Sequence, residues 1–147
     1  MNGLLLFNKR DFYPVALGSE PPEHFLATRV EGYEMAQYVN RFLPPQAKLL
    51  TRELREFYFD RPVERHAGYY RRYASICRNE EDLYRLLKQD GFTHLLWKES
   101  GEESRDWLPR KMVRNETLKA RGLKLLHETE FTPSGSHQRI RYSLYQL

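Results

Sequence analysis

The sequence predicts a single α/β domain, with a mixed sheet of about four strands, flanking helices and a C-terminal β-hairpin. Residues 79–98 read as a helix, a glycine and a buried strand, which is the second half of a βαβ unit and places this strand parallel to an earlier one near Leu49. Residues 123–131 and 139–147 read as two strands joined by the turn-rich segment TPSGSHQ. The chain of 147 residues is long enough to bury a core without disulfides.

Two helices are predicted in the first third of the chain. Residues 1–20 show little periodicity and are expected to form an N-terminal arm. A pair of prolines ending at Pro22 suits the first turn of a short helix that continues to about Arg29. A second helix is expected between Gly32 and Pro44, because apolar residues recur on one face at three- and four-residue spacing. These residues are Met35, Ala36, Val39, Phe42 and Leu43.

Strands and helices alternate after this point. A short strand is expected around Leu49, followed by a second extended piece at 57–63. Asn79 is a good N-cap for a helix that Gly91 is placed to end. Its buried face is predicted to consist of Leu83, Leu86 and Leu87. Residues 105–121 have helix-forming composition and are predicted to form one continuous helix.

Composition narrows the possible function classes. The net charge is +4 and the pI is near 9.2, which permits attraction to phosphates or to an anionic membrane surface. Both signs of charge are interspersed, so the positive charge is far less concentrated than in a dedicated nucleic-acid binder. No stretch is long and apolar enough for a membrane span or a signal peptide. We therefore expect either a soluble cytoplasmic protein or a piece of a longer chain.

No pattern in the sequence indicates a catalytic or metal site. The five histidines are scattered, and none has a second histidine or a cysteine at zinc-ligand spacing, so we predict no metal and no cofactor. A glycine-rich phosphate loop and a nucleophile elbow are both missing from the sequence. His94 is predicted to make a structural hydrogen bond at the end of a strand. Cys77, the single cysteine, is predicted to be a small core residue and not a nucleophile.

Arginines alternate with tyrosines between Arg65 and Arg78, including Tyr69, Tyr70 and Tyr73. Single-stranded nucleic acids and sugar phosphates are bound by such aromatic groups with cationic neighbours. Arginines stacked on tyrosines at a protein surface give the same pattern without any ligand, and this interpretation is favoured over nucleic acid. A stand-alone basic module that binds nucleic acid or a phosphate ligand stays open as the alternative function. It predicts an affinity that falls steeply with salt.

Charged and aromatic residues gather directly after the first predicted strand. In open α/β sheets, ligands usually bind at the carboxyl ends of the strands. These side chains either bind a saccharide or phosphate through bidentate arginine contacts and tyrosine stacking, or pair with one another and hold the loop to the sheet. The second interpretation is somewhat favoured. The ligand-binding candidates are Glu53, Arg55, Tyr58, Asp60 and Arg61.

Three stretches of the sequence carry a family resemblance. In the first, a helix with an Asn-x-x-x-Pro-like end leads into a strand through Asn40, Pro44, Pro45, Ala47, Lys48 and Leu49. The second, TRELREFYFDRPV, contains the five candidates and Pro62, and the third, DGFTHLLW, contains Gly91, Thr93 and His94. Together they resemble the soluble C-terminal domain of bacterial polytopic glycosyltransferases of the GT-C type, related to dolichyl-phosphate-mannose-protein mannosyltransferases. The segment YPVALGSEPPEHFLATR is similar to the part that follows the last membrane span in that family.

The resemblance implies an extracytoplasmic, periplasmic domain that lies over the transmembrane part of the same polypeptide, with residues 1–20 following a membrane segment. In that family an acidic residue in a loop between membrane helices transfers sugar from a polyprenyl-phosphate donor, and that loop is absent here. The chain alone is therefore expected to be non-catalytic. It would assist recognition of a saccharide acceptor or lipid-linked sugar, or support the active-site loops, and nucleic acid is not favoured as a partner. Arg52 and Glu56 depart from the family pattern, which often has glycine there.

Overall fold

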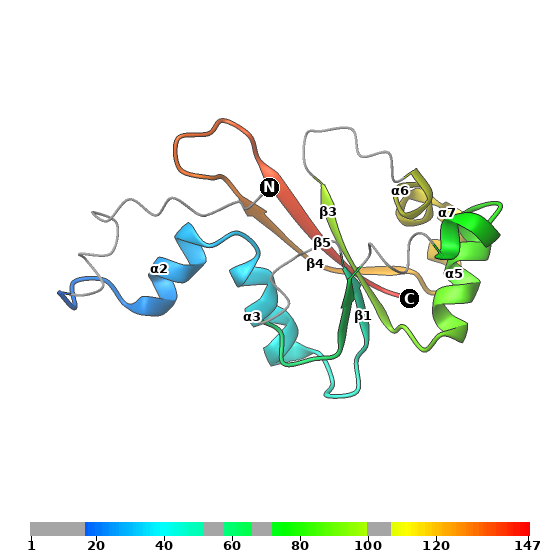
Figure 1. The fold of residues 1–147 in the computed structure, drawn as a ribbon, viewed down its shortest axis with the longest axis horizontal. Coiled ribbons are helices and arrows are strands. Elements are labelled where there is room, and N and C mark those ends of the chain that lie inside the picture. Colours follow the sequence, from blue (N-terminus) through cyan, green and yellow to red (C-terminus); the bar gives the residue numbers. More distant parts are fainter. Residues whose placement is uncertain (1–16, 52–57, 66–71, 100–106) are drawn as a thin grey trace.

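A five-stranded mixed sheet forms the centre of the fold (Figure 1). The computed structural model describes residues 17–51, 58–65, 72–99 and 107–147. The helices are α2 (Pro22–Arg29), α3 (Tyr33–Phe42), α5 (Glu80–Gln89), α6 (Trp107–Arg114) and α7 (Glu116–Ala120). The strands are β1 (Leu49–Thr51), β2 (Val63–Arg65), β3 (His94–Glu99), β4 (Lys124–Phe131) and β5 (Ile140–Gln146).

The strand order is β2-β1-β3-β5-β4. Strand β1 pairs in parallel with β2 and β3, whereas β5 pairs antiparallel with β3 and β4. The predicted α/β class, the parallel pairing of β1 with β3 and the C-terminal hairpin are confirmed. The second extended piece, expected at 57–63, forms a short edge strand at Val63–Arg65 and brings the number of strands to five.

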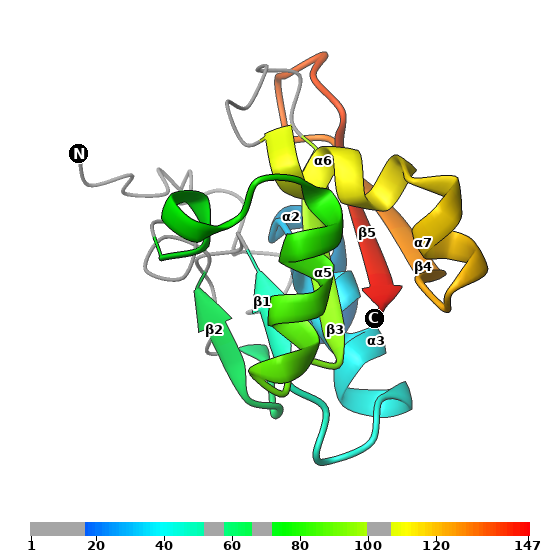
Figure 2. The ribbon, with the colours of Figure 1, turned by 90° about the vertical axis from the view of Figure 1, so that its right-hand side faces the viewer.

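Helices cover both faces of the sheet, with α3 on one face and α5, α6 and α7 on the other (Figures 1 and 2). Successive residues of a strand point to opposite faces, and the core is therefore divided in two. Leu49 and Leu96 pack in the cluster that includes residues of α3, whereas Leu50 and Leu95 pack with residues of α5, α6 and α7. All of these leucines are buried, which explains why β1 and the first part of β3 are apolar without alternation.

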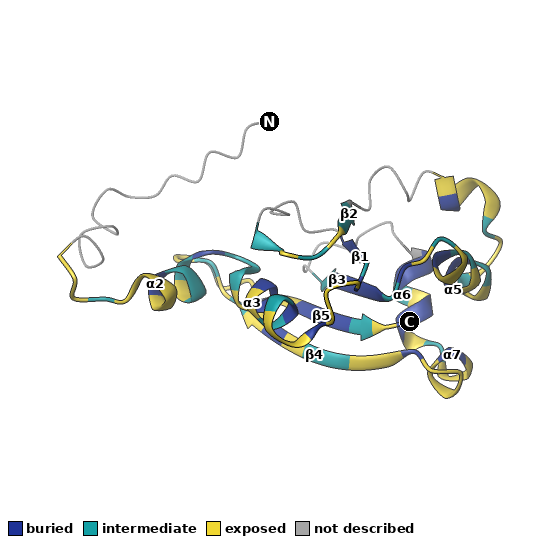
Figure 3. Ribbon diagram, turned by 90° about the horizontal axis from the view of Figure 1, so that it is seen from below, coloured by how far each residue is buried: buried dark blue, intermediate teal, exposed yellow. Residues whose placement is uncertain are grey.

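Helix α2 extends away from the sheet, at the far end from α5 (Figures 1 and 3). The turn that follows α2 is connected to the sheet by the carboxylate of Glu31. One oxygen of Glu31 accepts a hydrogen bond of 2.5 Å from the Tyr142 hydroxyl on β5 and forms an ion pair with Lys98 on β3. These contacts fix the entry of the chain into α3.

Helix α3 forms as the apolar spacing predicts, but Phe42 does not belong to its buried face. Met35, Ala36 and Val39 are fully buried, whereas Phe42 is 60% exposed. At 3.6 residues per turn, Phe42 falls at the border of the apolar stripe, next to Tyr38. Its ring packs against Tyr38, with 4.7 Å between the centroids, and Tyr38 stacks on His127 of β4 at 3.8 Å. Tyr38 thus covers part of the surface of β4 beside the apolar stripe.

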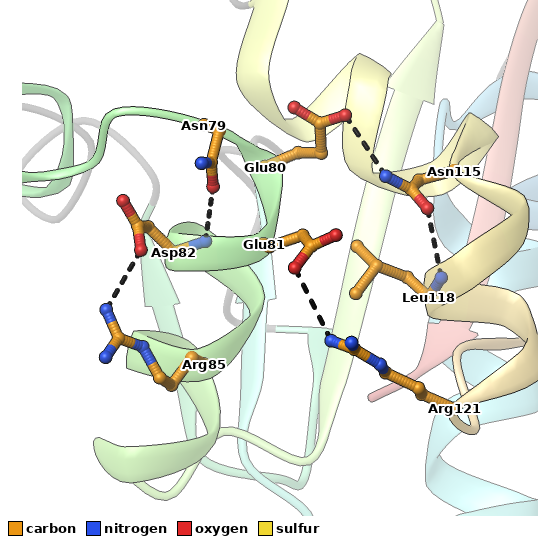
Figure 4. A network of polar contacts seen from close by, with 8 residues as sticks. All are labelled: Asn79, Glu80, Glu81, Asp82, Arg85, Asn115, Leu118 and Arg121. Carbon is orange, nitrogen blue, oxygen red and sulfur yellow. Dashed lines mark hydrogen bonds and ion pairs between the residues drawn. The ribbon is translucent and has the colours of Figure 1, made fainter.

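The segment predicted as one helix over 105–121 is two helices, and Asn115 separates them. The Asn115 side chain accepts a hydrogen bond of 3.0 Å from the backbone N–H of Leu118 and so caps α7. Its amide nitrogen donates to Glu80 on α5 at 3.1 Å (Figure 4). The predicted cap of α5 is confirmed, because Asn79 accepts from the backbone N–H of Asp82 at 2.9 Å. Gly91 ends this helix region with a φ of 81°.

Candidate functional site

The carboxyl ends of β1, β2 and β3 lie at one edge of the sheet, because these strands are parallel. They end at Thr51, Arg65 and Glu99, and the segments that follow them, 52–57, 66–71 and 100–106, lie outside the described residues. Glu53 and Arg55 fall in the first of these segments. The structure therefore describes three of the five candidates, namely Tyr58, Asp60 and Arg61.

Asn40 on α3 holds the described part of the candidate loop. Its side-chain nitrogen donates a hydrogen bond of 2.8 Å to the backbone carbonyl of Tyr58. Its side-chain oxygen accepts from the backbone N–H of Asp60, also at 2.8 Å. The Asn40 side chain thus pairs with one backbone carbonyl and one backbone N–H of an irregular segment. Asn40 belongs to the family resemblance in the sequence, but its role in holding this loop was not predicted.

Arg61 binds the carboxyl end of α3. Its Nη2 donates to the backbone carbonyls of Asn40 at 2.9 Å and of Leu43 at 3.0 Å, and its Nε donates to Leu43 at 3.3 Å. The last carbonyls of a helix have no partner within the helix and carry the negative end of its dipole, so a guanidinium is well suited to this position. The predicted partner of Arg61 was a neighbouring carboxylate. Within the described residues its side-chain partners are backbone carbonyls, including that of Asp60 at 3.4 Å.

The other two described candidates differ in exposure. The half-buried ring of Tyr58 meets Tyr33 edge-on, with 5.3 Å between the ring centroids, and so takes part in the packing of the loop on α3. Asp60 is exposed, and its backbone N–H is held by Asn40. Of the three described candidates, Asp60 is therefore the side chain that faces solvent from a fixed backbone.

The other residues of the family resemblance meet at the amino ends of β1 and β3. The backbone N–H of Lys48 donates to the Thr93 hydroxyl at 2.9 Å, and the Thr93 N–H donates back to the Lys48 carbonyl at 3.0 Å. The N–H of Leu49 donates to the carbonyl of Pro62 at 2.9 Å. The Lys48 ammonium forms an ion pair with Glu64 of β2 at 2.9 Å. Three separate stretches of the sequence are joined in this way, largely through backbone groups.

His94 begins β3 as a buried residue. Its Nδ1 lies 2.7 Å from the Thr93 hydroxyl, so it makes the kind of hydrogen bond at the strand end that the sequence predicted. Burial lowers the pKa of His94, because the charged imidazolium loses hydration.

The arginine–tyrosine stretch lies partly outside the described residues, including Tyr69 and Tyr70. Tyr73 is buried in the core and donates a hydrogen bond to the carboxylate of Asp90, with Arg72 3.9 Å from the same carboxylate. The expectation of surface stacking is wrong for Tyr73. Cys77 packs half-buried against the same core, and burial, aided by the Asp82 carboxylate, raises the pKa of its thiol.

Two further features bear on the expected chemistry and location. Within the described ranges, no three His, Cys, Asp or Glu side chains gather as a metal site would require. No helix in the part of the chain that the structure describes has the length and hydropathy of a membrane span.

Comparison of the chain with protein families, with curated proteins and with solved structures found no match.

Proposed function

We propose that this chain is the extracytoplasmic soluble domain of a membrane glycosyltransferase that uses a polyprenyl-phosphate-linked sugar. In this proposal the domain is non-catalytic alone, and it assists acceptor recognition or supports the active-site loops of the membrane part.

One observation carries the proposal, namely that the stretches with the family resemblance meet in space. Asn40 and Arg61 join the end of α3 to the candidate loop, and Lys48 and Thr93 join β1 to β3. Residues that match a family pattern by chance have no reason to contact one another across 18 to 45 positions of sequence. Their contacts support the view that the pattern encodes one structural unit.

The contacts also distinguish residues that hold the loop from a residue that can contact a ligand. Arg61, Asn40 and Tyr58 are engaged in holding the loop, so they suit a supporting role. Asp60 faces solvent from a fixed backbone, and a carboxylate of this kind can accept hydrogen bonds from saccharide hydroxyls. The alternative of a nucleic-acid module loses one of its stacking groups, because Tyr73 is buried.

Binding to three probes tests the proposal. The full chain is titrated with an oligosaccharide panel, with vesicles containing a polyprenyl phosphate, and with single-stranded DNA, each at low and high salt. We expect weak binding to saccharides or vesicles that Asp60→Asn reduces. Glu116→Gln is the matched control, since Glu116 is 83% exposed and lies on α7 at the other face of the sheet.

The outcomes separate the two roles and the alternative. Binding that Asp60→Asn weakens and Glu116→Gln does not supports acceptor recognition. Saccharide or vesicle binding unchanged in Asp60→Asn removes Asp60 from the ligand surface and favours the supporting role. Binding to DNA alone, falling steeply with salt, contradicts the proposal and favours the basic module.

A further inference from the structure

A cleft of about 650 Å³ lies on the solvent side of α5, where the end of α7 approaches it. Its volume is in the range of small-molecule sites. Helix α5 contributes most of its lining, and Arg121, directly after α7, contributes one wall. Helix α5, which forms most of the cleft, lies on the opposite face of the sheet from α3, which carries Asn40 (Figure 1). The cleft is therefore independent of the function proposed above.

The cleft contains three cations and two carboxylates, and both carboxylates already have partners. Glu81 pairs with Arg121 at 3.5 Å, and Asp82 pairs with Arg85 at 2.9 Å (Figure 4). Lys88, the third cation, makes no ion pair with a carboxylate in the described part of the chain. Its ammonium lies 5.3 Å from the centre of the Tyr84 ring. The lining therefore carries one positive charge more than its own acids neutralise.

Tyr84 adds a polar group beneath this charge. The residue is 7% exposed, and its buried hydroxyl has no hydrogen-bond partner among the described residues. A side-chain carbon added to Gly122 would lie 4.0 Å from that oxygen, which places the hydroxyl beside the wall that Arg121 begins. A buried hydroxyl without a partner is unfavourable, so a polar ligand that reaches it gains a hydrogen bond.

The ion pair that holds Arg121 at the wall of the cleft is weak. The Glu81–Arg121 contact is long at 3.5 Å, and its two side chains are 49% and 59% exposed, so breaking it costs little. Displacement of Arg121 from Glu81 frees a guanidinium for bidentate contact with an oxyanion. Glu81 is then available to accept hydrogen bonds from neutral hydroxyl groups. The same lining thus offers donors for an anion and acceptors for a polyol.

We propose that this cleft binds a small phosphorylated polyol, of the sugar monophosphate class. Lys88 and Arg121 contact the phosphate, and the carboxylates of Glu81 and Asp82 accept hydrogen bonds from the hydroxyl groups of the sugar. The ion pairs of Figure 4 explain how α5 is joined to α7. They do not involve Lys88 or the Tyr84 hydroxyl, which the ligand engages in addition to Arg121, Glu81 and Asp82.

Titration of the full chain with glucose 1-phosphate, inorganic phosphate and glucose tests this site. Chemical-shift changes are followed for the backbone amides of α5 and α7. We expect glucose 1-phosphate to bind with a Kd of about 1 mM or lower, and neutral glucose to bind at least tenfold more weakly. The shifts should be centred on the residues that line the cleft.

Two variants locate the binding. Lys88→Gln should weaken glucose 1-phosphate at least tenfold. Lys119→Gln, which removes the same charge from an α7 lysine outside the cleft, should change the Kd less than twofold. Both lysines are exposed, so both variants should keep the fold. Far-UV circular dichroism of each variant checks this. Tyr84→Phe should weaken binding about threefold, because it removes one hydrogen bond.

Any of three results overturns the proposal. Equal weakening by Lys88→Gln and Lys119→Gln means that the anion responds to the general positive charge of this side of the molecule. Shifts that are absent or lie outside α5 and α7 mean that the cleft is not the site. Binding of inorganic phosphate without a preference for the sugar phosphate overturns the assignment to a phosphorylated polyol.

Discussion

At the scale of single residues, Arg61 shows how a motif residue can be structural with no charged partner among the residues that the structure describes. Its guanidinium reaches two backbone carbonyls at the end of α3, Asn40 and Leu43. A sequence can suggest that an arginine has a carboxylate neighbour, but a backbone carbonyl carries no sequence signature. The sequence therefore predicted that the loop containing Arg61 is held in place. It did not predict that the carbonyls at the end of α3 hold it.

Replacing Arg61 should lower the stability of the fold. Arg61→Ala removes the charge-assisted hydrogen bonds to the end of α3, and we expect a loss of about 2 kcal/mol in the free energy of unfolding. Arg61→Lys keeps the charge but not the planar fork, so it should recover only part of this loss. Urea unfolding measures both variants. A change below about 0.5 kcal/mol in Arg61→Ala, as for an ordinary surface substitution, would show that these hydrogen bonds contribute little.

His94 should make the stability depend on pH. Burial lowers its pKa in the folded state below the unfolded value of 6.5, so the unfolded chain binds the proton more readily in the interval between the two. The contribution of neutral His94 to the free energy of unfolding is complete above about pH 6.5. It is lost as the pH falls from there towards the folded pKa. Unfolding free energies measured from pH 7.5 downwards should therefore decrease. His94→Gln should flatten this part of the profile, and an unchanged slope would assign the effect to other groups.

At the scale of elements, the sequence predicted the types of helix and strand better than their breaks. Asn79 and Gly91 have unambiguous local roles as cap and terminator, and the helix between them forms as expected. Asn115 has the same capping chemistry, but it stands inside a segment whose composition favours helix throughout. Its contact with Glu80 depends on where α5 lies, and tertiary placement is not encoded in the local pattern. Phe42 was misplaced for a similar reason, since periodicity identifies a stripe and not its borders.

Two substitutions at Asn115 should distinguish its two functions. Asn115→Asp keeps an acceptor for the Leu118 N–H but loses the donor to Glu80 and places two carboxylates together. Asn115→Ala loses both contacts. We expect Asn115→Ala to lower the free energy of unfolding by about 1 kcal/mol or more. Asn115→Asp should also lower it, by an amount that becomes smaller as the pH falls and the acids are protonated. Thermal unfolding at pH 7 and pH 4 measures this. An aspartate variant equal to wild type at pH 7 would exclude a role for the Glu80 contact.

At the scale of the whole molecule, the sheet separates two surfaces with different chemistry. On one face, α3, Asn40 and Arg61 form a backbone-rich connection between the end of a helix and a loop. On the other, α5 and the end of α7 present ion pairs and the Lys88 ammonium around a cleft. The sequence indicated the first region through the order of its motifs. It gave no sign of the second, because Lys88 and Arg121 are distant in sequence and become neighbours only when α7 packs beside α5.

The central position of β5 has a consequence for how this chain folds during its synthesis. Strand β5 is built from residues 140–146, yet it lies between β3 and β4 and is the described neighbour of β4. While the nascent chain is shorter than this, β3 presents an unpaired apolar edge and β4 has no partner in the described sheet. Cooperative closure of the described sheet must therefore wait until β5 has left the ribosome. Chains that stop before Ile140 would keep both edges open and would tend to aggregate.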